Sequence, residues 1–235
     1  MRVLISIYCW IAGVIIFVWF LLSALFCSFI FPERIYNPWL KKILRFLFVA
    51  IGTKVEVEGL ENLTPGASYL FMANHVSMFD MPLLGGFLPG ITRAVEAHSH
   101  SRWPLYGLVM RRLGNIPIER ESIHGSVASF RKTLLHLNNG KSMTILPEGH
   151  RTLNGEIQAF KKLPFLLAKQ IDKGIVPIGI SGLFRLKPKG TWIIQPTTLK
   201  ISFGKVIPKE EIDALSVLEL REHVRNEIIK RIERP

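Results

Sequence analysis

An uncharged apolar run at the N-terminus limits what this chain can fold into more than any other feature. From Val3 to Phe31 there is no Asp, Glu, Lys or Arg. A helix needs about 20 apolar residues to cross a bilayer, so the run is long enough. A cleaved signal peptide has a shorter apolar core, of about 7–15 residues. The run therefore predicts a retained membrane anchor, either one tilted span or a hairpin that folds back near Gly13 or Ser23.

Basic residues follow the apolar run directly, and the whole chain carries a net charge of +12. Basic residues beside a membrane segment tend to stay on the cytoplasmic side and are attracted to anionic headgroups. We therefore expect membrane lipids as partners, and the rest of the chain on the cytoplasmic side of the inner membrane. Nucleic acid is not an expected partner, because no DNA- or RNA-binding motif is present. The basic residues concerned are Arg34, Lys41, Lys42 and Arg45.

The pattern of apolar residues predicts two regions. Residues 1–52 comprise the anchor and an amphipathic helix over Ile35–Ile51, and residues 53–235 form one α/β domain around a mostly buried mixed sheet flanked by helices. Strands are predicted at Lys54–Glu58, Ser68–Ala73, Asn115–Ile118, Ser142–Leu146, Gly174–Ile180 and within Ile193–Phe203. Helices are predicted at Met78–Phe87, Trp103–Leu113, Ser126–Leu137, Ala159–Gln170, and from a capping box at Ser216 to about Ile232.

The clearest chemical signal is a histidine and an aspartate, His75 and Asp80, directly after the strand predicted to end at Ala73. The aspartate can accept a hydrogen bond from one imidazole nitrogen and so fix the tautomer. The other nitrogen is then free to take a proton from a hydroxyl group. Residues five apart do not share one face of a helix, so His75 has to lie in the turn before the helix.

Two other predicted strands lead to arginines, Arg120 and Arg151. The forked donors of arginine suit a phosphate group at the rim of a sheet. Gly149, which precedes Arg151 by two residues, allows a positive φ or a close approach of the backbone to a ligand. A surface ion pair is the commoner fate of a single arginine, but two at strand exits favour a phosphate site.

Four short motifs occur in order between about Val55 and Ile207. They are N-H-x-x-x-x-D from Asn74, G-x-I-P-I-x-R from Gly114, P-E-G-x-R from Pro147 and V-P-I from Val176. In this order and spacing the chain resembles the 1-acylglycerol-3-phosphate (lysophosphatidic acid) acyltransferase family. The resemblance implies that residues 53–235 are an acyltransferase domain. Such a domain moves a fatty-acyl chain from acyl-CoA or acyl-carrier protein to the free hydroxyl of a lysophospholipid, typically giving phosphatidic acid in phospholipid biosynthesis.

The same resemblance implies roles for individual residues and requires no cofactor beyond the acyl donor. The roles are general base for His75, its partner for Asp80, phosphate binding for Arg120 and Arg151, shaping of the acceptor site for Glu148 and Gly149, and lining of the acyl pocket for Pro177. No metal is expected. His98 and His100 lack companions for a zinc site, and neither cysteine lies in the domain.

The chain also departs from the family pattern close to the expected acceptor site. The stretch Ala94–Arg102 contains no lysine where the family has one, which leaves Arg93, His98 or Arg102 as substitutes. This departure from the family pattern means that the acceptor could be another lysolipid, such as a lyso-ornithine lipid or a lysophospholipid with a larger headgroup. Thioester hydrolysis and catalytically silent lipid binding are further alternatives.

Overall fold

The structure, a computed structural model, describes residues 1–118 and 140–233. Its strands are β1 (Val55–Glu58), β2 (Leu70–Ala73), β3 (Thr92–Ala97), β4 (Ile116–Ile118), β5 (Ser142–Ile145), β6 (Ile175–Ser181) and β7 (Leu199–Phe203). They form one seven-stranded sheet in the order β1-β7-β6-β2-β5-β3-β4. Only β6 and β7 pair in antiparallel fashion, so the predicted mixed sheet in an α/β fold is confirmed.

The central strands are buried on both faces, which explains their continuous apolar sequences. Every residue of β2 and β6 is buried. Because β6, β2, β5, β3 and β4 run parallel, their carboxyl ends meet at one edge of the sheet. The segments that follow these strands therefore come together there, where open α/β sheets usually bind their ligands.

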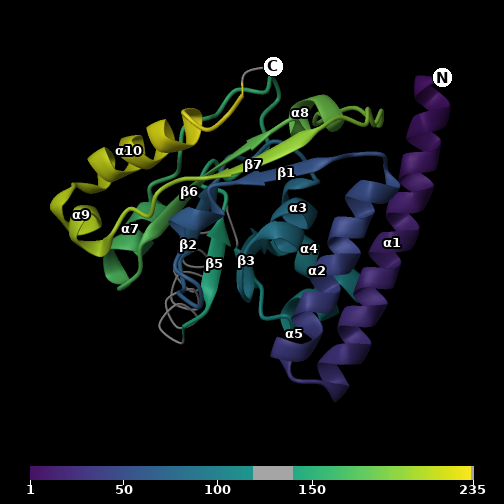
Figure 1. The fold of residues 1–235 in the computed structure, drawn as a ribbon, viewed down its shortest axis with the longest axis horizontal. Coiled ribbons are helices and arrows are strands. Elements are labelled where there is room, and N and C mark those ends of the chain that lie inside the picture. Colours follow the sequence, from purple (N-terminus) through teal and green to yellow (C-terminus); the bar gives the residue numbers. More distant parts are fainter. Residues whose placement is uncertain (119–139, 234–235) are drawn as a thin grey trace.

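Helices cover both faces of the sheet (Figure 1). Their bounds are α1 Arg2–Ile30, α2 Glu33–Ala50, α3 Asp80–Phe87, α4 His98–Ser101, α5 Pro104–Arg112, α7 Leu163–Gln170, α8 Leu183–Leu186, α9 Lys209–Ala214 and α10 Val217–Ile229, with a 3-10 turn, η1, at Leu60–Asn62. Side chains from α7, α9 and α10 pack on one face with Leu70 and Met72 of β2. Side chains from α1, α2, α3 and α8 pack on the other face with Phe71.

The two N-terminal helices form an antiparallel hairpin along one side of the molecule (Figure 1). Helix α1 is unbroken, so the predicted fold-back near Gly13 or Ser23 is wrong, and the chain reverses at Phe31 and Pro32. A residue before proline avoids the helical region, and Phe31 accordingly has φ −117° and ψ 147°. Gly13 instead faces α2, where a Cβ would lie 3.9 Å from a methyl group of Leu47.

Helix α1 is attached to the domain near both of its ends. The Ser6 hydroxyl accepts a hydrogen bond from the N–H of Ile194 (3.0 Å). At the other end, the Arg112 guanidinium lies 3.8 Å from the centre of the Phe29 ring, in cation–π contact. The N-terminal helix is therefore part of the folded domain's packing rather than a separate appendage.

Two of the four basic residues after the apolar run donate hydrogen bonds to carbonyl groups of the domain. The Lys41 ammonium donates to the carbonyl oxygen of Gly90 (2.6 Å), and Nε of Arg45 donates to that of Gly86 (2.7 Å). These carbonyls lie at the C-terminal end of α3, which attracts positive charge. Arg34, Lys42 and Arg45 are exposed, so the predicted attraction of headgroups falls mainly to these three residues.

Most predicted elements are present, with shifted ends. Helix α7 begins only at Leu163, because Pro164 belongs in a first turn. The capping box at Ser216 is confirmed, but a separate short helix, α9, precedes it. Strand β3 was not predicted. The predicted helix Ser126–Leu137 lies outside the described residues.

Candidate active site

His75 and Asp80 form the predicted pair at the carboxyl end of β2. His75 lies in the turn between β2 and α3, and Asp80 is the first residue of α3. Nδ1 of His75 lies 2.6 Å from Oδ2 of Asp80. The histidine side chain is 12% exposed and the aspartate side chain is fully buried. The Nδ1 edge of the His75 ring is thus held by Asp80, while the rest of the ring stays partly accessible to solvent.

The hydrogen-bond pattern assigns the tautomer of His75. Oδ2 of Asp80 also accepts from the backbone N–H groups of Val76 (2.8 Å) and Ser77 (3.0 Å). An oxygen that accepts twice from amides also acts as the acceptor toward the ring, so Nδ1 carries the hydrogen. Nε2 is then the unprotonated nitrogen, which can take a proton from a hydroxyl group.

The surroundings of Asp80 suit a residue that positions the histidine. Burial raises the pKa of Asp80, while its hydrogen bonds to His75 and to the two backbone amides oppose that shift. Because the aspartate side chain is fully buried and its Oδ2 faces Nδ1, Asp80 fixes the orientation of the His75 imidazole.

Asn74 extends the sheet by one step and so fixes the turn that carries His75. Its side-chain amide donates to the carbonyl oxygen of Ile180 (3.0 Å) and accepts from the N–H of Ile180 (2.8 Å). A buried asparagine with both amide functions paired locks the backbone around it. The sequence motif includes this residue, but its role depends on a partner in β6 that no local pattern reveals.

Glu148 holds the backbone of the turn between β2 and α3 that carries His75, called here the candidate catalytic turn. Its Oε1 accepts from the N–H of His75 (2.6 Å), and its Oε2 accepts from the N–H of Gln158 (2.8 Å). It is only 2% exposed, and burial raises its pKa. The residue thus ties the segment after β5 to the segment after β2. Its predicted role in shaping the acceptor site stays a prediction.

Gly149 and Arg151 follow Glu148 at the same edge of the sheet. Gly149 has φ +77°, a left-handed conformation that glycine adopts without strain. The turn closes with the Gly149 N–H donating to the carbonyl oxygen of Leu146 (3.0 Å). Arg151 is partly exposed, and the residue after it, Thr152, donates its N–H to the carbonyl oxygen of His75 (3.0 Å). The backbone of Arg151 therefore lies next to the turn that carries His75, and its predicted role in phosphate binding stays a prediction.

Of the other predicted site residues, Pro177 is not brought into this turn. Pro177 lies within β6, level with Met72, and its ring packs closely on Gly204. Its role in an acyl pocket stays a prediction. Arg120 lies outside the described residues.

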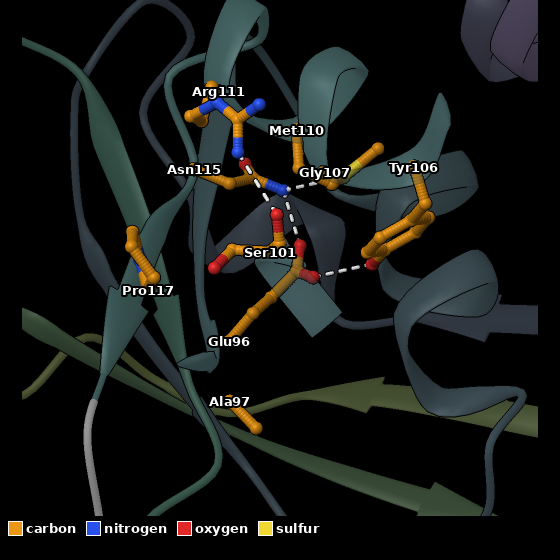
Figure 2. A pocket seen from close by; sticks show the side chains of 9 residues that line it. All are labelled: Glu96, Ala97, Ser101, Tyr106, Gly107, Met110, Arg111, Asn115 and Pro117. Atoms are coloured by element: carbon orange, nitrogen blue, oxygen red, sulfur yellow. Dashed lines mark hydrogen bonds between the residues drawn. The ribbon is translucent and has the colours of Figure 1, made fainter. Parts of the chain in front are cut away.

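The stretch without the expected lysine forms a hydrogen-bonded cluster around Glu96, shown in Figure 2. The buried Glu96 carboxylate accepts from the Tyr106 hydroxyl and from the Asn115 side-chain amide. Burial raises the pKa of Glu96. A small pocket here is lined by Glu96, Ala97, Ser101, Tyr106, Gly107, Met110, Arg111, Asn115 and Pro117. The cluster fixes the fold at the end of β3 and brings no lysine to the sheet edge.

Arg93, one proposed substitute for that lysine, is already engaged. Its guanidinium forms a nearly buried ion pair with Glu33, at the start of α2. Removing one partner of such a pair leaves a buried charge uncompensated, so the fold needs both residues of the pair. It joins the N-terminal hairpin to β3. In residues 1–118 and 140–233, no group of three or more His, Cys, Asp and Glu residues is arranged to hold a metal ion.

Comparison with known proteins gives concordant results. The family model described as Acyltransferase matches residues 54–181. The chloroplastic 1-acyl-sn-glycerol-3-phosphate acyltransferase of Arabidopsis thaliana is 26% identical over 190 residues, which are 77% of this chain and 53% of that protein. The enzyme of the same name from Borreliella burgdorferi is 26% identical over 183 residues, 77% of this chain and 73% of its own length.

A third relative is named for a different acceptor. The lyso-ornithine lipid O-acyltransferase of Pseudomonas aeruginosa is 30% identical over 151 residues, 63% of this chain and 54% of that protein. The chain thus spans about half the length of two of these three relatives.

A solved structure shares the fold over nearly the whole chain. The 1-acyl-sn-glycerophosphate acyltransferase PlsC from Thermotoga maritima superimposes with a TM-score of 0.84 at 24% identity, covering 98% of this chain and 95% of that one. The family model covers more than half of the chain and includes the His75–Asp80 pair, Glu148 and Arg151. The chain therefore belongs to the acyltransferase family.

Proposed function

We propose that the protein transfers a fatty-acyl chain from a thioester donor, acyl-CoA or acyl-carrier protein, to the free hydroxyl of a lysophospholipid. The observation that carries this proposal is the state of His75, whose Nδ1 donates to a buried aspartate and whose Nε2 is left as a base. The family match supports acyl transfer, and the names of the relatives suggest lysolipid acceptors.

The proposed reaction needs one base and no metal. Nε2 of His75 takes the proton of the acceptor hydroxyl while its oxygen attacks the thioester carbonyl carbon. The tetrahedral intermediate collapses, the carbon–sulfur bond breaks, and the proton held by His75 passes to the departing thiolate. Asp80 stabilises the imidazolium during the interval between these two proton transfers.

The acceptor that we favour is 1-acylglycerol-3-phosphate, which would yield phosphatidic acid. Arg151 beside the candidate catalytic turn suits a phosphate group, and two relatives carry this activity in their names. The Pseudomonas aeruginosa relative makes a lyso-ornithine lipid the second candidate.

A panel assay tests the proposal directly. Full-length protein in membranes is given labelled acyl-CoA with each of several acceptors, and the lipid products are identified by mass spectrometry. Phosphatidic acid as the main product supports the first candidate, and acylated ornithine lipid supports the second. Release of free fatty acid without any acyl lipid would indicate thioester hydrolysis. No turnover at all would indicate lipid binding without catalysis.

Replacing Arg151 with alanine should raise the KM for the phosphate-bearing acceptor by about 10–100-fold, with a smaller change in the KM for the donor. A hydrogen bond to a charged group contributes roughly 1.5–3 kcal/mol. Steady-state kinetics with each substrate varied in turn gives both values. Arg185→Ala, at an exposed position on α8, is the matched control. An unchanged acceptor KM in Arg151→Ala would remove the phosphate assignment. The motif makes the same prediction for Arg120.

We also propose that the α1–α2 hairpin holds the protein on a membrane. Helix α1 is the one helix within the described part of the chain that is long and apolar enough to span a bilayer. It is about 43 Å long at 1.5 Å per residue, and the domain contacts it near both ends. These contacts favour a hairpin inserted from the cytoplasmic side over a lone crossing helix. Most of the exposed large apolar side chains also belong to α1 and α2.

The full-length protein should stay in the membrane fraction through a wash with about 1 M NaCl, which shortens the screening length to roughly 3 Å. Attraction between basic residues and headgroups fades under that screening, but burial of apolar side chains does not. Immunoblots of pellet and supernatant measure the partition, and a detergent wash is the positive control. Release by salt alone would show that the hairpin is not an anchor.

A further inference from the structure

Lys187 is a buried cation close to the candidate catalytic turn. It follows α8 and is only 7% exposed. Its ammonium donates to the carbonyl oxygen of Pro188 at 3.3 Å and lies 6.0 Å from the centre of the Trp10 ring. Within residues 1–118 and 140–233, no carboxylate lies within ion-pair distance of it. Burial of an ammonium group with such weak partners lowers the stability of the fold. A lysine at this position is therefore better explained by a function than by stability.

The backbone of Lys187 is joined to the turn that carries His75. The hydroxyl of Ser77 donates to the carbonyl oxygen of Lys187 (2.8 Å). From another loop, the N–H of Thr152 donates to the carbonyl oxygen of His75 (3.0 Å), which sets Arg151 beside the same turn. Two segments far apart in sequence therefore place the backbones of Lys187 and Arg151 beside the turn that carries His75.

The two cations act on each other. Burial lowers the pKa of Lys187, and the positive charge of Arg151 lowers it further. Neighbouring like charges destabilise each other unless an anion lies between them. Groups perturbed in this way gather at functional sites. Arginine offers forked donors and lysine a point charge, and proteins use both to bind phosphate.

We propose that Lys187 and Arg151 together bind the phosphate group of the acceptor lipid. This inference rests on the proposed function and adds a residue to it. Lys187 supplies a lysine where the stretch Ala94–Arg102 has none, and Arg93, one of the possible substitutes, is paired with Glu33. Phosphates also occur in the CoA donor, so the test has to distinguish acceptor from donor. A neutral acceptor would leave the two cations uncompensated.

The test compares Lys187→Met with wild type in the full-length, detergent-solubilised protein. Methionine keeps an unbranched apolar chain against Trp10 but removes the charge. We expect the KM for 1-acylglycerol-3-phosphate to rise about tenfold or more, as for loss of a charged hydrogen bond. The KM for acyl-CoA and the kcat should change by less than about twofold on the same reasoning. Lys189→Met, exposed two residues further on, is the matched control and should behave like wild type.

A second acceptor separates charge recognition from a general structural role. With phosphate-free 1-acylglycerol, wild type and Lys187→Met should have equal kcat/KM, so the variant loses discrimination between the two acceptors. An equal fall with both acceptors, or a rise confined to the acyl-CoA KM, would overturn the proposal. A wild-type protein that acylates no lysolipid at all would instead overturn the proposed function.

Lys187→Gln is a second variant, to be used if Lys187→Met does not fold, because the glutamine amide can still donate to the carbonyl oxygen of Pro188. Binding of glycerol 3-phosphate is then compared between this variant and wild type. Glycerol 3-phosphate should raise the melting temperature of wild type and compete with the acceptor, and it should do both less well with Lys187→Gln. Absence of stabilisation and competition in wild type refutes the phosphate site even if neither variant folds.

Discussion

Replacing His75 with alanine should lower kcat for acyl transfer by about 10²–10⁴-fold, the usual contribution of a positioned general base. The loss follows from the geometry, since Nε2 is the nitrogen left to receive the hydroxyl proton once Nδ1 donates to Asp80. Single-turnover assays with saturating acceptor and donor measure the chemical step directly. His223→Ala is the control, because His223 is a surface histidine paired with Glu211.

The alanine variant has a structural side effect that needs its own check. It removes one donor from the buried Asp80 carboxylate, which can cost roughly 1–3 kcal/mol of stability. His75→Gln offers an amide in place of the ring and serves as a second variant. Circular dichroism and the melting temperature show whether each variant is folded. A folded variant with wild-type turnover would eliminate His75 as the base.

A chain truncated to begin at Pro32 should fail to form a stable domain. Helix α1 contributes Ile16, Phe20 and Leu21 to the buried core. Burial of each such side chain contributes about 1.5–3 kcal/mol, and their sum rivals the entire net stability of about 5–15 kcal/mol. Loss of α1 also uncovers the face of α2 that packs against it. We therefore expect aggregation or a melt without a cooperative transition.

Ile15→Ser is the matched control for the truncation, because Ile15 is exposed on α1. This substitution should weaken membrane attachment while the melting transition stays cooperative. Calorimetry in mild detergent and a flotation assay with vesicles read the two properties separately. A truncated chain that melts like the full-length protein would show that α1 is a dispensable tether.

The elements that could be predicted from the sequence are those whose partners are close in sequence or uniformly apolar. Strands β2 and β6 are continuous apolar runs, and the His75–Asp80 pair lies within one short motif. Strand β3 was missed because it buries Arg93 and Glu96, which disturb the apolar pattern. Their ion-pair and hydrogen-bond partners come from α2, α5 and the segment before β4, and only the folded chain brings these together.

The predicted fold-back near Gly13 is wrong for a local reason. A glycine costs only about 1 kcal/mol inside a helix, so Gly13 does not break α1, whereas Pro32 ends it. Lys187 belongs to no motif, and its contacts with Ser77 and Trp10 come from distant segments. The local pattern identifies the His75–Asp80 pair, but it does not identify the distant segments that surround this pair.

The attachment of α1 to the last third of the chain sets an order of events during synthesis. Ser6 and Ile194 are 188 residues apart, so α1 leaves the ribosome long before its partner exists. Domains assemble as their segments emerge, and apolar surface that waits uncovered in water aggregates. We therefore expect α1 to enter the bilayer while translation continues and to meet the loop around Ile194 only near its end. The lipid bilayer would then serve the nascent chain as a holding environment, before it supplies any substrate to the finished enzyme.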